Sequence, residues 1–421
     1  MNNKISLTAL IIWITCAIFF MYEFLLRTIL GTFEHQIISD LDLTLVTFSI
    51  LSSTAYQFIY GIMQVPVGFI TDKLGLKKTL TMAVGICALG VGMFALSNSF
   101  SAALIYRVLM GFGSAFGFLC LLVAVYDWLP HKYIGLFIGL SQFIGVLGPM
   151  VAAGPLDSLS NTSGIDWREV FIILAGVGVI LAIITVLIVK NNKQSDDKFV
   201  IIDKPISILD NIKSLISTRQ VWFIAFFSAS VYFSIEFLSE NAAKPFLMLH
   251  SFDPKVASYM ITLAWLGYGI GCPSLGFISD TIKRRKPIMI FSAILAFFAL
   301  AVIIFIPINI YILSIAFICL GIGASGQSIG FAIIAEQCQK YYLAAGLGVN
   351  NFLIMLSVSI GSPFISYILS SLSGGGKITI SEYEIALCIP LLFIVVGIIL
   401  SVFFIRETFC RSMKEVITVE V

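Results

Sequence analysis

The chain has 421 residues, of which 59% are hydrophobic and 11% are charged, and its formal net charge is +2. Soluble domains carry about 25% charged residues, so the composition excludes an ordinary soluble protein. Outside short loops no basic stretch is interleaved with aromatic residues, which argues against nucleic-acid binding.

Twelve apolar segments follow one another along the chain, each about long enough to cross a bilayer as a helix. Isolated strands cannot satisfy their backbone groups in lipid, so we predict an all-α integral membrane protein. The first run lacks a small-residue cleavage site and is interpreted as a retained helix rather than a signal peptide. The predicted spans are residues 8–33, 46–70, 79–97, 101–128, 133–156, 168–189, 221–247, 255–278, 287–306, 309–335, 342–371 and 384–405.

Basic residues between the spans are concentrated on one side of the predicted bilayer. With the N-terminus inside, that side holds most of the lysines and arginines, including six between 190 and 219. The opposite side keeps only Arg168, Lys255 and Lys377. Because loops rich in lysine and arginine stay in the cytoplasm, we predict that both termini are cytoplasmic.

Two charged loops of the chain are near copies of each other. GFITDKLGLKK occupies residues 68–78 and GFISDTIKRRK occupies residues 276–286, an offset of 208 residues. Two halves of six spans with the same orientation are a transporter architecture. We therefore predict an N-terminal bundle at 1–189, a cytoplasmic linker at 190–219 and a C-terminal bundle at 220–421.

The first of these loops resembles the G-x-x-x-D-x-x-G-x-K/R-K/R signature of the major facilitator superfamily. The second copy keeps the first glycine, the aspartate and the basic cluster, but has Lys283 in place of the second glycine. The fourth span is similar to the family's R-x-x-x-G-x-G motif. The matching residues are Gly68, Asp72, Gly75, Lys77 and Lys78 in the loop, Gly276 and Asp280 in its copy, and Arg107, Gly111 and Gly113 in the fourth span.

The resemblance covers essentially the whole chain and implies a secondary transporter that works by alternating access. It also implies that spans 1, 4, 7 and 10 line a central cavity and that the protein is a monomer. YEFLLR at 22–27 is similar to phagosomal nutrient transporters of intracellular bacteria, which import amino acids, nucleosides or related solutes. A composition rich in Asn, Lys and Ile fits an AT-rich bacterial genome, so the expected location is a bacterial inner membrane. Gly145-x-x-Gly148-Pro149 resembles part of the antiporter glycine-proline motif and keeps export open as an alternative.

Six charged residues fall at bilayer depth, where each costs about 2.5–3.5 kcal/mol on insertion scales and requires a cavity or a partner. Five of them lie on the first and seventh spans, and Arg107 lies on the fourth. Because Glu236, Glu240 and Lys244 are spaced four residues apart, we predict that they form a ladder of charges on one face of the seventh span. One interpretation is a set of buried ion pairs that hold the helices in register. Such pairs stabilise poorly compared with apolar packing, so we favour a role in transport. The six are Glu23, Arg27, Arg107, Glu236, Glu240 and Lys244.

We assign two roles to these groups and their neighbours. Glu23 is the first candidate for a proton-coupling carboxylate, with Arg107 or Arg27 as the cation with which it exchanges, and Glu236 is the second candidate. Arg27 presents a planar fork suited to a substrate carboxylate or phosphate. The further substrate-binding candidates are Glu240, Asn241, Lys244, Tyr22, Tyr60, Gln64, Trp265 and Tyr268.

The duplicated loops are predicted to act as gates rather than as binding sites. In the first half Asp72 is expected to cap or pair at the cytoplasmic end, and Lys77 and Lys78 are expected to reach acidic partners such as Asp127. In the second half Asp280, Arg284 and Arg285 are expected to pair toward Glu336. Both sets are predicted to favour the outward-open state and to break when the halves rock.

The resulting hypothesis is a proton-coupled importer of a small polar organic solute that bears a carboxylate, such as an amino acid, a nucleoside, or a hydroxycarboxylate or siderophore-like metabolite. The alternatives are a proton-driven exporter and a membrane receptor on a transporter scaffold. An enzyme is not expected, because no nucleophile–base constellation or metal-ligand cluster is present and the three histidines and eight cysteines are scattered singly. We expect no metal and no cofactor.

Overall fold

The computed structural model describes residues 5–64, 66–130, 134–191, 218–306, 309–337, 343–374 and 376–411. Within these ranges the regular structure is entirely helical, and twelve helical segments are long and apolar enough to cross a membrane. The predicted all-α membrane fold is therefore confirmed. The predicted linker at 190–219 lies almost wholly outside the described ranges, and its role stays a prediction.

The first half contains six spans, some of them built from two or three helical pieces. The second span runs through a π-helical turn, and α5 joins the end of that span to the third. The elements are α1 (Leu7–Thr32), α2 (Glu34–Asp40), α3 (Leu45–Ser49), η1 (Ile50–Thr54), α4 (Ala55–Met63), α5 (Pro66–Ala95), α6 (Phe100–Ser114), α7 (Gly117–Trp128), α8 (Ile134–Ser163) and α9 (Trp167–Ile188).

The second half repeats this arrangement, and its seventh span is also interrupted by a π-helical turn. Its elements are α11 (Arg219–Phe237), η3 (Leu238–Ala242), α12 (Ala243–Leu249), α13 (Pro254–Ile282), α14 (Lys286–Phe305), α15 (Ile310–Ala324), α16 (Gln327–Gln337), α17 (Leu343–Ser373), α18 (Ile380–Ile399) and η4 (Leu400–Phe404).

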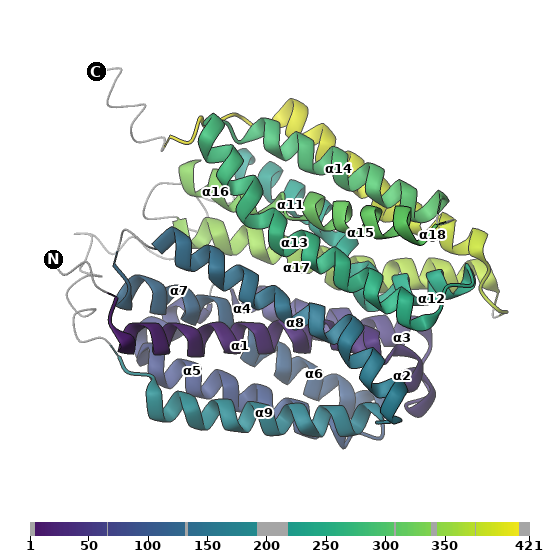
Figure 1. Ribbon diagram of the computed structural model, residues 1–421, viewed down its shortest axis with the longest axis horizontal. Helices are drawn as coiled ribbons and strands as arrows, with labels where there is room; N and C mark the ends of the chain where they lie inside the picture. The colour runs from purple at the N-terminus through teal and green to yellow at the C-terminus, as the bar shows by residue number, and fades with distance from the viewer. Residues whose placement is uncertain are drawn as a thin grey trace.

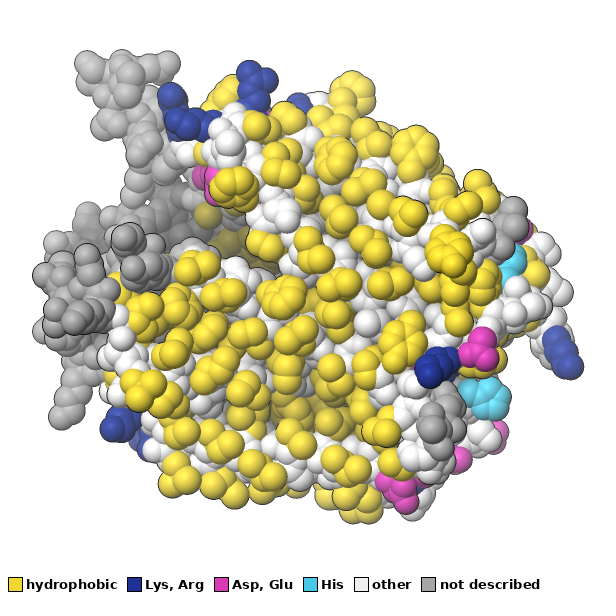
Figure 2. Space-filling view, viewed as in Figure 1, with side chains coloured by type: hydrophobic (Ala, Val, Ile, Leu, Met, Phe, Trp, Pro, Cys, Tyr) yellow, Lys and Arg dark blue, Asp and Glu magenta, His cyan; other side chains and the backbone are white. Residues whose placement is uncertain are grey.

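The long helices lie side by side in two bundles, with the first half below the second in Figure 1. We call the end that carries Leu7 and Phe404 the inner end, because the sequence predicts that it faces the cytoplasm, and the other end the outer end. Figure 2 shows hydrophobic side chains across the middle of one face and most charged side chains at its two ends. Large apolar side chains of the spans, such as Phe298 and Leu392, are 62% and 64% exposed and add to the apolar surface. Lipid would cover it in a bilayer.

The two duplicated loops turn through a left-handed residue at equivalent positions. Gly75 has φ of 76° within α5, where the helix of the second span ends and that of the third begins. Lys283, 208 residues later, closes α13 with φ of 51°. Glycine takes a positive φ at little cost, so the second copy keeps the turn without its favoured residue. The second copy therefore departs from the motif at Lys283, the residue whose left-handed conformation makes the turn.

The halves are joined from the middle of the molecule to its outer end. α8 packs against α13, and α4 packs against α17. The Thr262 hydroxyl accepts a hydrogen bond from the Gly154 amide at 2.9 Å. At Gly31, where α1 crosses η3, a β-carbon would overlap the Ser239 carbonyl, so only glycine permits this approach. Toward the inner end the surface is recessed between the halves (Figure 2).

Candidate functional site

An ion pair between the first and seventh spans lies at the centre of the molecule. The Arg27 Nε lies 3.1 Å from the Glu236 Oε1, and both side chains are almost fully buried, with exposed fractions of 5% and 0%. The same oxygen accepts a hydrogen bond from the Gln57 amide at 3.1 Å. The other oxygen accepts one from the Tyr232 hydroxyl at 2.7 Å. Two hydrogen-bond donors and the Arg27 guanidinium therefore surround Glu236, an arrangement that stabilises a carboxylate out of water.

Aromatic rings enclose the guanidinium of Arg27. Its Cζ lies 3.7 Å from the centroid of the Phe24 ring and 5.8 Å from that of Tyr60, and its Nη2 donates to the Tyr232 hydroxyl at 3.1 Å. Trp265 packs edge-on against Phe24, with ring centroids 5.2 Å apart. The cation is thus held by ring faces and one carboxylate, a planar and dry environment that suits a small organic anion.

Arg107 supports the backbone that carries Arg27. Its guanidinium donates to the carbonyls of Leu26 at 2.5 Å, Arg27 at 2.7 Å and Ser52 at 2.9 Å. Its Cζ also lies 4.5 Å from the centroid of the Tyr56 ring. Arg107 therefore ties α1 to η1, and its contacts are to backbone oxygens rather than to the predicted partner Glu23.

Glu23 is buried one turn inward from Arg27. Its Oε2 accepts a hydrogen bond from the Tyr56 hydroxyl at 3.3 Å, and its Oε1 has no hydrogen-bond partner among the described residues. The absence of a side chain at Gly117, on the fourth span, leaves room for its carboxyl group. Glu240 is similar, because it accepts from Ser53 at 3.0 Å and its Oε1 has no described partner. A buried carboxyl group without an ion pair is costly as an anion.

The π-helical turns η1 and η3 face each other across the halves and are joined by hydroxyl and amide groups. The Asn241 carbonyl oxygen accepts hydrogen bonds from Ser49 at 2.8 Å and Ser52 at 3.1 Å. Its amide nitrogen donates to Ser53 at 3.1 Å. Ser49 also bonds to Ser366 of α17. π-Helical turns occur frequently at functional sites, and here they place a polar seam directly outward of the ion pair.

Lys244 leaves the predicted ladder of charges on the seventh span. η3 ends at Ala242, whose φ of −135° departs from helical geometry. The Lys244 ammonium forms an ion pair with Asp157 of α8, and the other oxygen of Asp157 accepts from Ser258 at 2.7 Å. The two side chains are 20% and 4% exposed. Asp157 was not identified from the sequence, because it lies one residue beyond the predicted fifth span.

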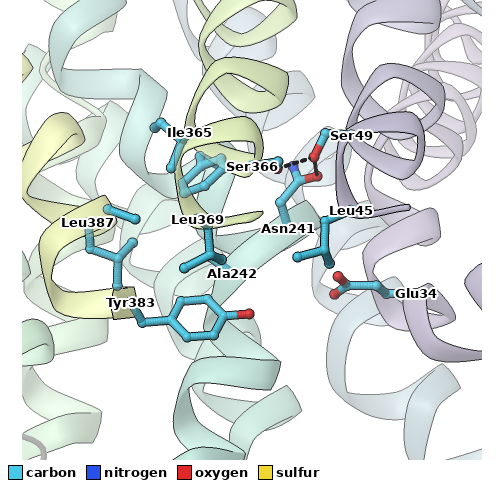
Figure 3. Close-up of a pocket in the computed structure, with 12 residues that line it drawn as sticks. Glu34, Leu45, Ser49, Asn241, Ala242, Ile365, Ser366, Leu369, Tyr383 and Leu387 are labelled. Atoms are coloured by element: carbon cyan, nitrogen blue, oxygen red, sulfur yellow. Dashed lines mark hydrogen bonds between the residues drawn. The ribbon is translucent and has the colours of Figure 1, made fainter. Parts of the chain in front are cut away.

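Two small cavities flank the polar seam toward the outer end, each of about 10 Å³, which is room for about one water molecule. Figure 3 shows the first, between Glu34 of α2 and Tyr383 of α18, with Asn241 and Ser49 at its inner side. Burial raises the pKa of the half-buried Glu34 carboxyl from 4.5 to about 8, against the opposing effect of the Lys244 charge. The outer end is therefore closed, with a titratable group at its edge.

Unpaired polar atoms lie on the other side of the ion pair, toward the inner end. They belong to fully buried side chains of α11 and α17 and to the partly buried Gln327 at the start of α16. Buried polar atoms without partners are rare in proteins and mark sites where water or a ligand binds. Among the described residues the atoms without partners include Ser228 Oγ, Ser234 Oγ, Gln327 Oε1, and Asn350 Nδ2 and Oδ1.

The remaining substrate-binding candidates differ in how close they lie to the Arg27–Glu236 ion pair. Tyr268 lies beside Tyr232, with ring centroids 5.8 Å apart, and its hydroxyl accepts from Gln327 at 2.5 Å. Gln64 donates to the Tyr60 carbonyl of its own helix at 3.1 Å. The Tyr22 hydroxyl donates to the Leu174 carbonyl of α9 at 2.9 Å, so it points away from the opposite half.

The gating candidates of the second half form a compact cluster. Arg285 pairs with Asp280 at 2.6 Å and with Glu336 at 2.7 Å, and Arg284 lies near the ring of Phe409 instead. The cluster links α13, α14 and α16, which belong to one half, so these contacts do not cross the interface between the halves.

The gating candidates of the first half are described only in part. The backbone amide of Lys77 donates to Asn191 at 2.9 Å, and Lys78 is exposed. Asp127 lies at the inner end of α7, and the side chain of Asp72 is outside the described set. The described part of the chain contains no group of three or more His, Cys, Asp or Glu side chains that could hold a metal ion.

Comparisons with known proteins agree with this architecture. The family model described as Major Facilitator Superfamily matches residues 12–249 and 237–412. The chain is 25% identical over 192 residues to the probable L-galactonate transporter of Escherichia coli, covering 46% of this chain and 41% of that protein. It is 24% identical over 272 residues to the hexuronate transporter of Bacillus subtilis, covering 62% of each. The matches thus span less than two thirds of these relatives.

A solved structure has the same fold over nearly the whole chain. The crystal structure of the nucleoside transporter NupG superimposes with a TM-score of 0.72 at 14% sequence identity, covering 94% of this chain and 100% of that one. Identity at this level supports the shared fold alone.

Proposed function

The chain belongs to the major facilitator superfamily, and from that premise we propose that it imports a small organic acid together with a proton by alternating access. Arg27 carries this proposal, because it is a buried guanidinium within the first span that pairs with a carboxylate of the opposite half. A substrate carboxylate can pair with the guanidinium in place of the Glu236 carboxylate. The substrate and Glu236 would then compete for one cation.

This competition supplies a route to coupling. When a proton neutralises Glu236, the Arg27 guanidinium loses its anionic partner and becomes available to a substrate anion. One proton and one monoanion then cross the membrane with no net charge. On release to the cytoplasm the proton leaves Glu236, and the ion pair between the halves forms again. Glu23, which has no described ion pair, is the second candidate for the proton-carrying group.

The polar atoms around the ion pair favour a substrate that bears hydroxyl groups. Among the described residues, Asn350 and Ser234 are buried side chains with unpaired polar atoms, and Ser234 lies two residues before Glu236 in α11. The relatives named above are transporters of L-galactonate and hexuronate, which are sugar acids. We therefore rank sugar acids first among the substrate classes, ahead of amino acids and nucleosides.

The present arrangement corresponds to an inward-facing state. The outer end is closed by the pair of Lys244 with Asp157 and by the polar seam at Asn241. With the predicted orientation, substrate would leave through the recessed inner end of the interface. We place the protein in a bacterial inner membrane, as a monomer with both termini in the cytoplasm.

A thermal-shift screen of the purified protein tests the substrate class. The compounds are L-galactonate, D-galacturonate, an amino acid mixture and a nucleoside mixture, each measured on the wild type and on the Arg27→Lys variant. We expect stabilisation by a sugar acid in the wild type and a loss of at least about tenfold in affinity in the variant, because lysine lacks the planar fork. Stabilisation by nucleosides alone, with equal affinity in both proteins, would contradict the proposal.

Export is the second candidate, on the basis of Gly148. A β-carbon there would overlap the Met21 carbonyl and the Leu25 amide of α1, so the glycine-proline segment lies at the crossing of the first and fifth spans. Inverted vesicles separate the two directions. Accumulation driven by a proton gradient in inverted vesicles indicates export, and accumulation in right-side-out vesicles indicates import.

A further inference from the structure

An open groove lies at the inner end of the second half, far from the central ion pair. Its volume is about 620 Å³, and its lining includes Arg284, Lys286, Phe291, Ile294, Glu407 and Phe409. Ligand sites in proteins commonly measure about 300–1,000 Å³. The groove therefore has the size of a binding site, and its lining is basic at one end and apolar at the other.

The basic end of the groove carries charge that no described residue neutralises. Within the described part of the chain, neither Arg284 nor Lys286 forms an ion pair, and Arg284 lies 5.8 Å from the centroid of the Phe409 ring. Further exposed basic residues surround them, and Figure 2 shows basic side chains gathered at the inner end of this half. These neighbours are Lys283, Arg406 and Arg411.

The one carboxylate among the described lining residues already accepts hydrogen bonds from the backbone. Glu407 accepts hydrogen bonds from the backbone amides of Arg285 at 2.8 Å and Lys286 at 2.9 Å. It also accepts from the amides of Thr408 at 3.0 Å and Phe409 at 3.1 Å. Four backbone donors thus fix this carboxylate at the start of α14 and hold the segment after η4 in place. Glu407 therefore shapes the groove without forming an ion pair with Arg284 or Lys286, so these two side chains can bind another anion.

The apolar end of the groove continues along the exposed face of α14. Phe291 and Ile294 are 51% and 38% exposed, and Phe298 on the next turn is 62% exposed. Residues spaced three or four apart lie on one helix face, so the floor of the groove joins a stripe that faces lipid. A soluble anion gains no stabilisation from contact with such an apolar floor, whereas an acyl chain does.

From the free basic pair and the lipid-facing floor, we propose that this groove binds an anionic phospholipid of the cytoplasmic leaflet. The phosphate group lies between Arg284 and Lys286, and one acyl chain lies over Phe291 and Ile294. Basic residues at the membrane surface attract anionic headgroups in this way. The site is independent of the transport site and of the proposed substrate.

Native mass spectrometry of the full-length protein in detergent tests the site. The protein is titrated with phosphatidylglycerol, with phosphatidylcholine of the same acyl chains, and with inorganic phosphate. Three double variants are compared with the wild type. Arg284→Gln/Lys286→Gln removes the charges, Arg284→Lys/Lys286→Arg retains them, and Lys190→Gln/Arg219→Gln removes two exposed charges elsewhere at the inner end.

We expect the wild type to bind phosphatidylglycerol in preference to phosphatidylcholine and not to retain inorganic phosphate. The charge-removing variant should bind phosphatidylglycerol about tenfold more weakly, and the other two should stay within about twofold of the wild type. Equal binding of both lipids to the wild type, retention of inorganic phosphate, or an equal loss in the Lys190/Arg219 pair would overturn the proposal. The wild-type lipid preference and the charge-retaining variant decide the matter even if the glutamine variant does not fold.

Discussion

Arg27 of the first span and Glu236 of the seventh form a buried ion pair across the two halves, with Nε and Oε1 3.1 Å apart. No other described ion pair has both partners so deeply buried. Replacing one partner of a buried pair leaves an uncompensated charge at a cost of about 3–5 kcal/mol. A group that neutralises one partner, such as a proton or a substrate anion, therefore changes the free energy of holding the halves together.

The first prediction concerns the proton site. Glu236→Gln keeps the shape and one acceptor for Arg27 but cannot bind and release a proton. We expect substrate counterflow to persist in proteoliposomes and accumulation driven by the proton gradient to be lost. Glu23→Gln serves as the comparison. If accumulation survived in Glu236→Gln and disappeared in Glu23→Gln, the proton would have to be assigned to Glu23.

The second prediction concerns the outer end. Lys244→Met leaves Asp157 buried without its cation, so the outer-closed state should lose about 3 kcal/mol, roughly a 100-fold shift toward the outer-open state. Two spin labels measure the distance between the halves at the outer end. They are attached at Leu96→Cys and Ile310→Cys, which are exposed outer positions of the two halves, in a background free of native cysteines. Lys255→Met, which removes an exposed outer lysine, is the control. An unchanged distance distribution in Lys244→Met would show that the pair does not close the gate.

The third prediction concerns pH. Burial in the closed outer end raises the pKa of Glu34 to about 8, and opening should return it toward 4.5. The closed state therefore binds the Glu34 proton more tightly, and its population should fall as pH rises from about 5 to about 8. The same spin-label pair measures this, and Glu34→Gln should flatten the profile, whereas Asp42→Asn at an exposed outer position should not. A flat wild-type profile would refute this role.

The fourth prediction tests whether Arg107 stabilises the fold or takes part in proton coupling. Arg107→Gln cannot satisfy three buried carbonyls, and each unpaired group costs about 1–3 kcal/mol. We expect the melting temperature to fall by roughly 5 °C or more, with a matching loss of transport. The proton-to-substrate ratio of the remaining activity should be unchanged. A variant with normal stability and lost coupling would instead support the proton-coupling role predicted from the sequence.

The twelve spans were predictable because each depends on its own apolar length. The buried charges of the first and seventh spans were also predictable, since their cost at bilayer depth makes them conspicuous. Their pairing was not, because it depends on how the halves meet. Arg107 shows why, since its partners are backbone carbonyls, which the sequence does not display.

The π-helical turns caused the largest difference between expectation and structure. A π turn adds one residue to the helix and rotates the following positions by about 100°. The predicted ladder of Glu236, Glu240 and Lys244 assumes an unbroken helix, whereas η3 lies within it and Lys244 turns to Asp157. Asp157 itself lies one residue beyond the predicted fifth span, which ends at residue 156. The helix continues to Ser163 instead.

The central claim is that one anion and one proton cross together through the Arg27–Glu236 pair. Its most direct test is the simultaneous measurement of substrate and proton uptake in proteoliposomes, with radiolabelled L-galactonate as the first compound and a pH-sensitive dye inside. We predict that substrate addition drives proton entry in the wild type, in proportion to substrate uptake, and that Arg27→Gln abolishes both. Substrate uptake without proton entry, or uptake that survives in Arg27→Gln, would contradict the account.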